Sequence, residues 1–428
     1  MLDEVFQSFS YPPGPGRELL NLIIGQSGRA TVRRLVDLSA CAVDRCSVGL
    51  TPLLRSWLEA SGDAFWHPAV SGIKAHLNNS NEDIPAKCLV ELGFVAQLDG
   101  AAGLWSFQFQ GPTTLRIDRW SLPEITSGVV EGNGARISLR MLSNNGCSQI
   151  LILTRDVQTG MWRRSRSTSA ICRLPTVEFT PYHRILLLPR EMADMELLPQ
   201  FPGAAFNGAA DLGQFANCLK QSAALISANA SEYLSWIGEV INVIAPVAVR
   251  GHLLGSSSSG KLSGVISISD NQHPLSVAEF LVHEASHQYF SVATSLGEVD
   301  TGSEGQLFYS RFARRYRPLE RILAGFHALG NIALFYEKCL ANGIPCEARL
   351  SYIATHMREL DETLHNASTL TSLGQALWLP LSQKTRHIDM KADETVSNAV
   401  LAEADRVMAE LKQRSRCGVE SDFDDGHA

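Results

Sequence analysis

The sequence lacks the features that would place it in several large classes of protein. Its 428 residues carry a formal net charge of −7 and no basic block, which argues against nucleic acid as the main partner. The longest apolar run, residues 240–249, is interrupted by Asn242 and Pro246 and is too short to span a bilayer. The first residues have an acidic start and no apolar core, so no signal peptide is expected. These absences predict a cytoplasmic protein without a membrane partner.

Cysteine is present, but not in the spacing of a cysteine-built site. Of the nine cysteines, Cys41 and Cys46 are five residues apart, and Cys339 and Cys346 are seven apart. Neither spacing is that of a zinc knuckle or an iron–sulfur cluster. An odd number of scattered cysteines predicts free thiols in a reducing compartment.

What the sequence does contain is a histidine pair with metal-ligand spacing. Residues 283–287 read His-Glu-Ala-Ser-His, an H-E-x-x-H motif. On an α-helix, His283 and His287 lie one turn apart on the same face, so that both imidazoles can reach one metal ion. Ser276 and Glu279 form an S-x-x-E capping box ahead of an apolar run, which predicts the start of the helix. The alternative is an ordinary helix with two histidines and no metal.

Length and hydrophobic patterning predict how the chain is divided. With 45% hydrophobic and 19% charged residues, most of the chain should fold, into two or three structural units. The periodicities predict an α+β fold that is mainly helical, with a strand-rich middle and a helical, metal-binding C-terminal half. The predicted regions are 1–100, helical; 101–190, strand-rich; 191–415, helical and catalytic; and 416–428, a disordered acidic tail.

Individual elements follow from the same periodicities. Alternating apolar residues predict strands at 105–109, 137–142, 149–154 and 264–269. Helical spacing predicts helices at 18–24, 32–38, 53–58, 88–94, 212–229, 231–244, 319–339, 348–365 and 396–411. His67, just before a proline, is expected at a helix boundary. The glycine- and serine-rich residues 250–260 lack the Gly-Lys-Ser ending of a phosphate loop, and form either a linker or part of the cleft wall.

A useful metal site needs a third ligand. An adamalysin/matrixin-type site is excluded because Phe290 and Ala293 stand where H-E-x-x-H-x-x-G-x-x-H requires glycine and histidine. A thermolysin-type site takes a glutamate from a following helix. Glu304 lies in a glycine-flanked segment, and Glu337 lies 50 residues beyond His287, so neither glutamate is well placed.

His327 is the preferred third ligand. It lies in the middle of an apolar helical segment, with Asn331 one turn further on. Three neutral imidazoles would suit zinc, or iron if water, cosubstrate and dioxygen fill the other positions. The alternative is a core histidine whose ring is satisfied by Asn331 or by a backbone carbonyl.

Several segments taken together resemble one bacterial family. These segments are residues 264–269, Leu-Val-His-Glu-Ala-Ser-His at 281–287, Tyr-Ser at 309–310, Arg-Pro-Leu at 317–319, Phe-His-Ala-Leu-Gly-Asn at 326–331, Leu-Thr-Ser-Leu-Gly at 370–374 and His-Pro at 67–68. The pattern resembles the HEXXH-motif peptide-modification proteins, the 2-oxoglutarate-dependent HExxH-type peptide β-hydroxylases. The likeness covers most of the chain and is strongest over residues 264–340.

The resemblance implies an enzyme with an Fe(II) centre that uses 2-oxoglutarate and O₂. Its expected reaction is hydroxylation at the β-carbon of a residue in a ribosomally made precursor peptide, a step of natural-product maturation. His283 and His287 would bind the metal with His327 as the third ligand. Glu284 would orient a ligand or a bound water.

The cosubstrate needs its own contacts. The far carboxylate of 2-oxoglutarate requires a cation, usually an arginine that binds through two nitrogens. Arg317, at the start of the helix that carries His327, is the first candidate and Arg311 the second. Tyr309 and Ser310 are candidates for hydrogen bonds to the cosubstrate.

Two other functions stay open. One is a zinc-dependent peptidase in which Glu284 acts as the general base on an attacking water. The other is a non-catalytic, peptide-binding scaffold whose H-E-x-x-H motif is vestigial. The sequence leaves open which peptide and which residue are modified, whether the strand-rich middle binds a leader peptide, and the oligomeric state.

Overall fold

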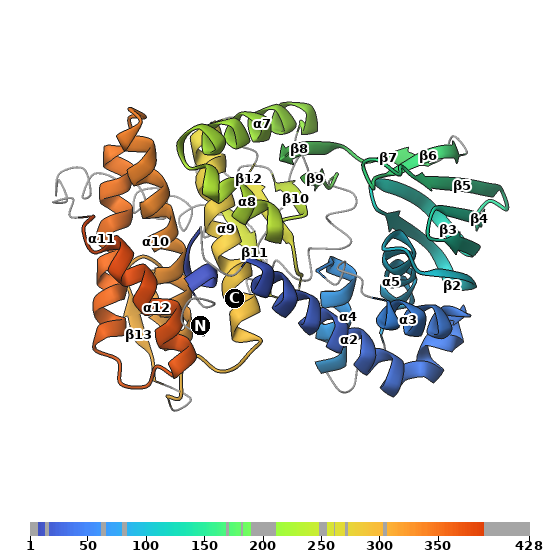
Figure 1. Ribbon diagram of the computed structural model, residues 1–428, viewed down its shortest axis with the longest axis horizontal. Helices are drawn as coiled ribbons and strands as arrows, with labels where there is room; N and C mark the ends of the chain where they lie inside the picture. The colour runs from blue at the N-terminus through green and yellow to red at the C-terminus, as the bar shows by residue number, and fades with distance from the viewer. Residues whose placement is uncertain are drawn as a thin grey trace, which may run out of the picture.

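The computed structural model describes residues 7–12, 17–60, 66–78, 84–167, 171–180, 183–189, 211–247, 255–260, 262–269, 273–302 and 306–388. The predicted helix at 396–411, the predicted tail at 416–428 and Glu304 lie outside these residues. The predicted α+β fold is confirmed, with a strand-rich middle and a helical C-terminal half (Figure 1). No helix in the described ranges combines the length and apolar character needed to cross a bilayer.

The first part of the chain packs helices on a largely antiparallel sheet, seen at one end of Figure 1. The three strands predicted here are confirmed, because they fall in β2, β4 and β5. The helices and the sheet share one hydrophobic core. In this core the ring centroids of Phe94 in α5 and Trp105 in β2 are 5.1 Å apart. The predicted helical and strand-rich regions therefore form one unit. Its elements are α2 (Arg17–Cys46), β1 (Ser47–Val48), α3 (Leu50–Glu59), α4 (Pro68–Asn78), α5 (Ala86–Leu98), β2 (Ala102–Ile117), β3 (Trp120–Asn133), β4 (Arg136–Ser143), β5 (Ser148–Arg155), β6 (Trp162–Ser167) and β7 (Cys172–Arg173).

A second sheet occupies the centre of the molecule, in the order β11-β12-β10-β9-β8. β10 runs parallel to β9 and β12, whereas β11 is antiparallel to β12. Since β9 pairs with β10, this sheet joins segments from both sides of the boundary predicted at residue 190. Its elements, with the two helices that lead into β10, are β8 (Thr176–Thr180), β9 (His183–Leu187), α7 (Leu212–Asn229), α8 (Ser231–Val240), β10 (Val243–Val247), β11 (Ser256–Ser258) and β12 (Val265–Ser269).

The helix predicted for 231–244 is wrong in its second part. α8 ends at Val240, and β10 begins at Val243. Nearly every residue of β10 is buried, so the apolar run shows no alternation and cannot be told from a helix by periodicity. Pairing with β9 and β12 on both sides decides the conformation.

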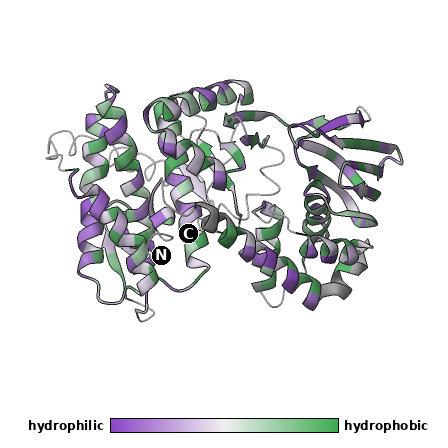
Figure 2. Cartoon of the chain, viewed as in Figure 1, coloured by the Kyte–Doolittle hydropathy of each residue, from purple (hydrophilic) through white to green (hydrophobic). Residues whose placement is uncertain are grey.

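The C-terminal half is a bundle around α9 (Pro274–Thr294) and α10 (Leu319–Ala341), which pack against each other. α11 (Glu347–His365) and α12 (Ser372–Thr385) cover α10, and a hairpin of β13 (Phe308–Ser310) and β14 (Arg315–Arg317) precedes it. Hydrophilic and hydrophobic residues occur together on these helices, as in amphipathic elements (Figure 2). The helices predicted at 319–339 and 348–365 are confirmed. α12 was not predicted, because Pro380 lies within it.

The predicted capping box is also wrong. α9 begins at Pro274, in the first turn where proline is favoured, and no side chain caps it. Glu279 instead lies inside the helix, where it accepts hydrogen bonds from Tyr336 Oη (2.5 Å) and Arg349 Nε (2.9 Å). These partners come from α10 and α11, so no local sequence pattern predicts that they contact Glu279.

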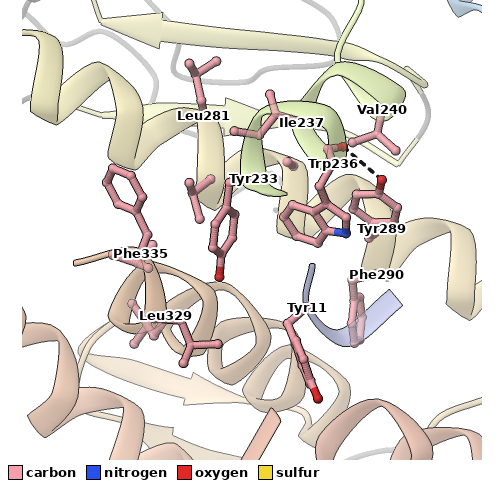
Figure 3. Close-up of a cluster of buried hydrophobic side chains, with 14 of the residues drawn as sticks. Tyr11, Tyr233, Trp236, Ile237, Val240, Leu281, Tyr289, Phe290, Leu329 and Phe335 are labelled. Carbon is pink, nitrogen blue, oxygen red and sulfur yellow. Dashed lines mark hydrogen bonds between the residues drawn. The ribbon is translucent and has the colours of Figure 1, made fainter. Parts of the chain in front are cut away.

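The N-terminal segment at 7–12 is packed into the core of the bundle. Phe9 is fully buried and meets Tyr289 of α9 edge to face, with ring centroids 6.4 Å apart. Figure 3 shows the adjoining aromatic cluster, in which Tyr289 stacks on Trp236 at 4.3 Å and donates a hydrogen bond to its carbonyl. A chain end far away in the sequence therefore lies beside the helix that carries the histidine pair.

Gly374, at the start of α12, packs closely against the loop that follows α9. Its N–H bonds to Thr371 Oγ1, which itself donates to the carbonyl of Glu298. A Cβ at Gly374 would collide with the Val299 carbonyl oxygen, so Gly374→Ala should lower the free energy of unfolding by about 1–3 kcal/mol. Gly297→Ala is the control, because its Cβ meets nothing closer than 3.7 Å. Urea denaturation that gave equal stabilities for the two variants would contradict this.

His67 lies at a helix boundary, as predicted. It precedes the first residue of α4, and its Nδ1 accepts a hydrogen bond from the N–H of Ala69 at 3.1 Å. Burial, and then the nearby charge of Arg116, lower the pKa of His67 to about 3.

This low pKa predicts a pH dependence of stability. Below about pH 6.5 the unfolded chain takes up a proton at His67, but the folded chain does not until near pH 3. Stability therefore falls as the pH falls, by about 2 kcal/mol between pH 7 and pH 5 from this group. Between pH 7 and pH 5, the free energy of unfolding of His67→Gln should fall by about 2 kcal/mol less than that of the wild type. Urea denaturation at both pH values measures the difference, and equal losses would show that His67 does not titrate in this way.

Candidate metal centre

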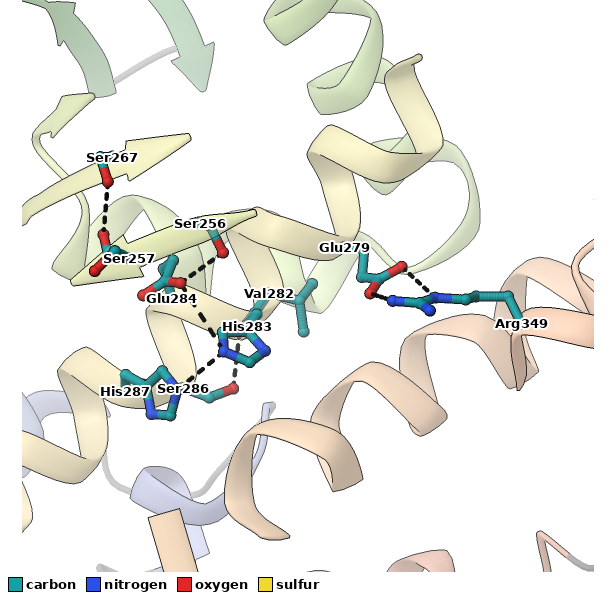
Figure 4. A network of polar contacts seen from close by, with 10 residues as sticks. All are labelled: Ser256, Ser257, Ser267, Glu279, Val282, His283, Glu284, Ser286, His287 and Arg349. Atoms are coloured by element: carbon teal, nitrogen blue, oxygen red, sulfur yellow. Dashed lines mark hydrogen bonds and ion pairs between the residues drawn. The ribbon is translucent and has the colours of Figure 1, made fainter. Parts of the chain in front are cut away.

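The two histidines of the motif converge on one point. His283 and His287 project from the same face of α9, with their Nε2 atoms 3.0 Å apart and their ring planes at 80° (Figure 4). Two nitrogens about 2.1 Å from one metal lie about 3.0 Å apart at an octahedral angle and about 3.4 Å apart at a tetrahedral angle. The predicted arrangement on one helix face is confirmed, and its spacing fits two ligands of one ion.

The charge state of His287 suits metal binding. Burial, and then the charges of His283, His327, Arg321 and Arg317, hold the pKa of His287 well below its usual value. A neutral imidazole offers a lone pair, which is the form that binds a metal. The side chain of His283 is 24% exposed, so the pair can be reached from outside.

Glu284 lies beside the pair and is almost fully buried. Its Oε1 accepts a hydrogen bond from Ser256 Oγ at 2.6 Å and lies 3.9 Å from His283 Nε2 (Figure 4). Its Oε2 is buried and meets no hydrogen-bond donor among the described residues. A buried carboxylate oxygen without a donor is costly, and a water or ligand that donates to it would remove that cost.

Ser256 comes from the glycine- and serine-rich segment that precedes β12. The described part of this segment forms β11, the last strand of the central sheet on that side. No described strand pairs with its outer edge. Of the two interpretations of this segment, the contact with Glu284 favours the cleft wall over a plain linker.

His327 lies on α10, close to the pair but engaged elsewhere. It is fully buried, and its Nε2 lies 2.7 Å from the carbonyl oxygen of Phe9. Burial lowers its pKa to about 4, although the carbonyls of Phe9, Ser286 and Ser10 act in the opposite direction. Because the neutral ring donates from Nε2, only Nδ1 keeps a lone pair, and Nδ1 is buried without a hydrogen bond to any described residue.

Asn331, one turn beyond His327, holds the same segment. Its Nδ2 donates to the carbonyl of Ser10 at 2.8 Å, and its Oδ1 accepts from Tyr233. In this conformation His327 and Asn331 hold residues 7–12 by hydrogen bonds to backbone carbonyls. This arrangement matches the alternative prediction, in which His327 is a core histidine bonded to a backbone carbonyl. Within the ranges that the structure covers, no three His, Cys, Asp or Glu side chains are placed to share a metal. The described residues thus fit two protein ligands, and the third ligand stays a prediction.

The predicted cosubstrate arginines differ in their surroundings. Arg317 is half-buried, its Nε has no hydrogen-bond partner among the described residues, and its charge acts on His287. Burial, and then the charges of Arg315 and Arg321, lower the pKa of Arg317. Arg311 is exposed and forms an ion pair with Glu359 at 2.9 Å. Of the two, Arg317 is the cation available to a ligand near the histidines.

The other two residues predicted to bind the cosubstrate, Tyr309 and Ser310, make their contacts within the β13–β14 hairpin. Tyr309 is 54% exposed, and its ring packs 5.3 Å from that of Tyr316. Ser310 is buried, and its Oγ accepts from the N–H of Ala313 at 3.2 Å. Neither residue contacts the histidine pair in the conformation described.

Other residues of the site were not predicted. Ser256 sits in a low-complexity stretch whose only signal is its position ahead of a strand. Gln288 follows His287 and accepts from the N–H of Gly264 at 3.0 Å, which joins α9 to the start of β12. The contact of Phe9 with His327 spans 318 residues, and a single sequence carries no signal for it.

Comparison of the chain with models of known protein families and with curated proteins finds no match. The resemblance to HExxH-type peptide β-hydroxylases therefore stays a prediction, and the function is argued from the site.

Proposed function

We propose that this chain is an Fe(II)- and 2-oxoglutarate-dependent oxygenase that hydroxylates a β-carbon in a ribosomally made precursor peptide in the cytoplasm. The observation that carries the proposal is the imidazole pair of His283 and His287, whose Nε2 atoms are 3.0 Å apart, together with Arg317, whose charge acts on His287 and whose Nε has no partner among the described residues. When bound, the iron would supply the activation of O₂. The protein's own residues would bind and orient the reactants.

Arg317 has the properties required of the cosubstrate's anchor. A guanidinium that is half-buried and lacks a carboxylate partner is under-stabilised, and an incoming carboxylate would compensate it with two parallel hydrogen bonds. A dicarboxylate has one end to approach the metal pair and one end for Arg317. This pairing favours 2-oxoglutarate over a site that needs only water.

A peptide substrate is supported by the strand beside the site. β11 ends the central sheet, and Ser256 on it bonds directly to Glu284. An extended peptide that pairs with the outer edge of β11 would run past the histidine pair. Main-chain pairing accepts many sequences, as a peptide-modifying enzyme requires.

The second candidate is a zinc-dependent peptidase, which one observation favours. Glu284 is buried, is held by Ser256, and keeps Oε2 without a donor. A carboxylate in this position could take the proton of an attacking water as general base. In the oxygenase, Glu284 would instead position a water or ligand.

The test uses full-length protein loaded anaerobically with Fe(II) and titrated with 2-oxoglutarate. A chelated keto acid gives a weak visible charge-transfer band. Arg317→Met should weaken 2-oxoglutarate binding by about 10- to 100-fold, whereas Arg311→Met, whose partner is Glu359 on the surface, should not change it. Absence of the band, together with one tightly held zinc, would transfer the assignment to the peptidase.

The same spectra decide the role of His327. If His327 is the third ligand, His327→Gln abolishes the band, as His283→Ala should. If it only anchors residues 7–12, the band persists and the variant loses stability instead. Thermal unfolding of the same samples separates the two results.

A further inference from the structure

A cavity of about 430 Å³ lies where the N-terminal unit meets the central sheet. It is bounded by the start of α4, the end of α5, the turn between β2 and β3, and parts of β9 and β10. Neither His283 nor His287 lines it. Its size is in the range of small-molecule binding pockets.

Arg119 is the most informative residue in the cavity wall. It is 9% exposed, and its Nη2 donates to the carbonyl of Trp162 at 2.6 Å. Its Nε is buried and meets no hydrogen-bond acceptor among the described residues, because Asp118 Oδ2 is 3.8 Å away. A buried guanidinium with an unused donor is stabilised by an added acceptor.

His67 supplies a second donor. Its Nδ1 accepts from the Ala69 N–H, so the neutral ring carries its proton on Nε2. No residue in the described ranges accepts that proton. Two nitrogens of cavity-lining residues, Arg119 Nε and His67 Nε2, thus have hydrogens to donate and no acceptor among the described residues.

The charges around the cavity favour an anion. Arg116 and Arg184 also line it, the latter 3.6 Å from Glu178. The lining carboxylates are Asp99, which accepts from Trp57 at 2.7 Å, and Asp118. Burial raises the pKa of Asp118, although nearby arginines act in the opposite direction. The three lining arginines therefore outnumber the two lining carboxylates.

The turn that carries Arg119 has an unusual backbone. Ile117 pairs with Trp120, so Asp118 and Arg119 form a two-residue hairpin loop. Asp118 has a φ of 51°, in the region that favours glycine. A positive φ is what a two-residue hairpin loop requires, and this turn places Arg119 in the cavity wall.

The rest of the wall is apolar. Trp66, Val95, Leu98, Met161 and Leu186 line it. The Nε1 of Trp66 is used by the Val240 carbonyl, so its ring offers only apolar surface.

We propose that this cavity binds an organic carboxylate with an apolar body. The carboxylate would accept hydrogen bonds from Arg119 Nε and His67 Nε2, and the apolar body would pack on Trp66 and Leu186. This proposal does not depend on the metal site. The carboxylate could belong to a free acid or to the end of a short peptide.

The test uses full-length protein without added metal and two isosteric probes, 4-phenylbutyrate and 4-phenylbutanol. Calorimetry, with tryptophan fluorescence as a second readout, should show the acid binding about 10- to 100-fold more tightly than the alcohol. Arg119→Met should remove that preference. Arg184→Met, at a less buried position, should reduce it if Arg119→Met fails to fold. Arg140→Met, an exposed arginine of β4, is the matched control and should bind as the wild type does.

A second arm compares the tripeptide Ala-Ala-Phe as acid and as amide. Binding of the peptide acid but not the amide would identify a peptide terminus as an acceptable source of the carboxylate. Binding of phenylbutyrate alone would restrict the site to free acids. Equal binding of acid and alcohol, full acid binding in both cavity variants, or no binding of any carboxylate at millimolar concentration would overturn the proposal.

Discussion

His287→Ala is expected to lower the affinity for Fe(II) or Zn(II) by at least about 100-fold. The described residues bring only two metal-ligating nitrogens together, and this change removes one of them. The pKa of His287 is held well below its usual value, chiefly by burial, so its ring offers a lone pair near neutral pH. Competition with a chromogenic chelator measures the affinity of each variant.

The control for this prediction is another histidine of the same half. His365, exposed at the end of α11, is outside the site, so His365→Ala should keep the wild-type affinity. The fold of His287→Ala should persist, because no described hydrogen bond links its ring to another element. Wild-type metal affinity in His287→Ala would remove the support for the metal site and leave the scaffold hypothesis.

Glu279→Ala is expected to lower the free energy of unfolding by about 2–4 kcal/mol. The carboxylate is buried, and it accepts from Tyr336 of α10 and pairs with both Nε and Nη2 of Arg349 of α11. Without it, a guanidinium and a buried hydroxyl lose their partner together. Figure 4 shows this pair on the part of α9 away from the histidines, so metal affinity should change little. Urea denaturation gives the stability.

Two further variants test the reason for that loss. Glu359→Ala removes a partly exposed carboxylate that pairs with the exposed Arg311 and lies 3.3 Å from His356 Nδ1, and it should cost about 1 kcal/mol. Adding Arg349→Met to Glu279→Leu removes the partly exposed Arg349 charge together with the buried carboxylate, so much of the stability should return. If Glu279→Ala were as mild as Glu359→Ala, the buried network would not stabilise the contact of α9 with α10 and α11.

Much of the candidate site was predictable because its geometry is local. The four-residue spacing of His283 and His287 sets their shared helix face, and the structure confirms it. The helix at 319–339 was predictable for the same reason, since its apolar residues recur at helical spacing. Glu284 follows from the motif, although its contact with Ser256 does not, because that contact joins a helix to a strand 28 residues away.

Other predictions failed or stayed open where contacts between distant segments compete with local preference. Residues 243–247 carry an apolar run compatible with helix or strand, and pairing with β9 and β12 made it a strand. Glu279 had a capping role available, but two donors from other helices offer it stronger hydrogen bonds in a buried place.

Local spacing and side-chain chemistry were therefore enough to predict the helix that carries the histidine pair, the α+β class and the shared helix face of His283 and His287. Only the packed fold decided that the Phe9 carbonyl would bond to the ring of His327, that the charge of Arg317 would act on His287, and that Arg119 and His67 would line one cavity. The physical reason is that helical periodicity acts over a few residues, whereas burial brings together groups that are tens or hundreds of residues apart.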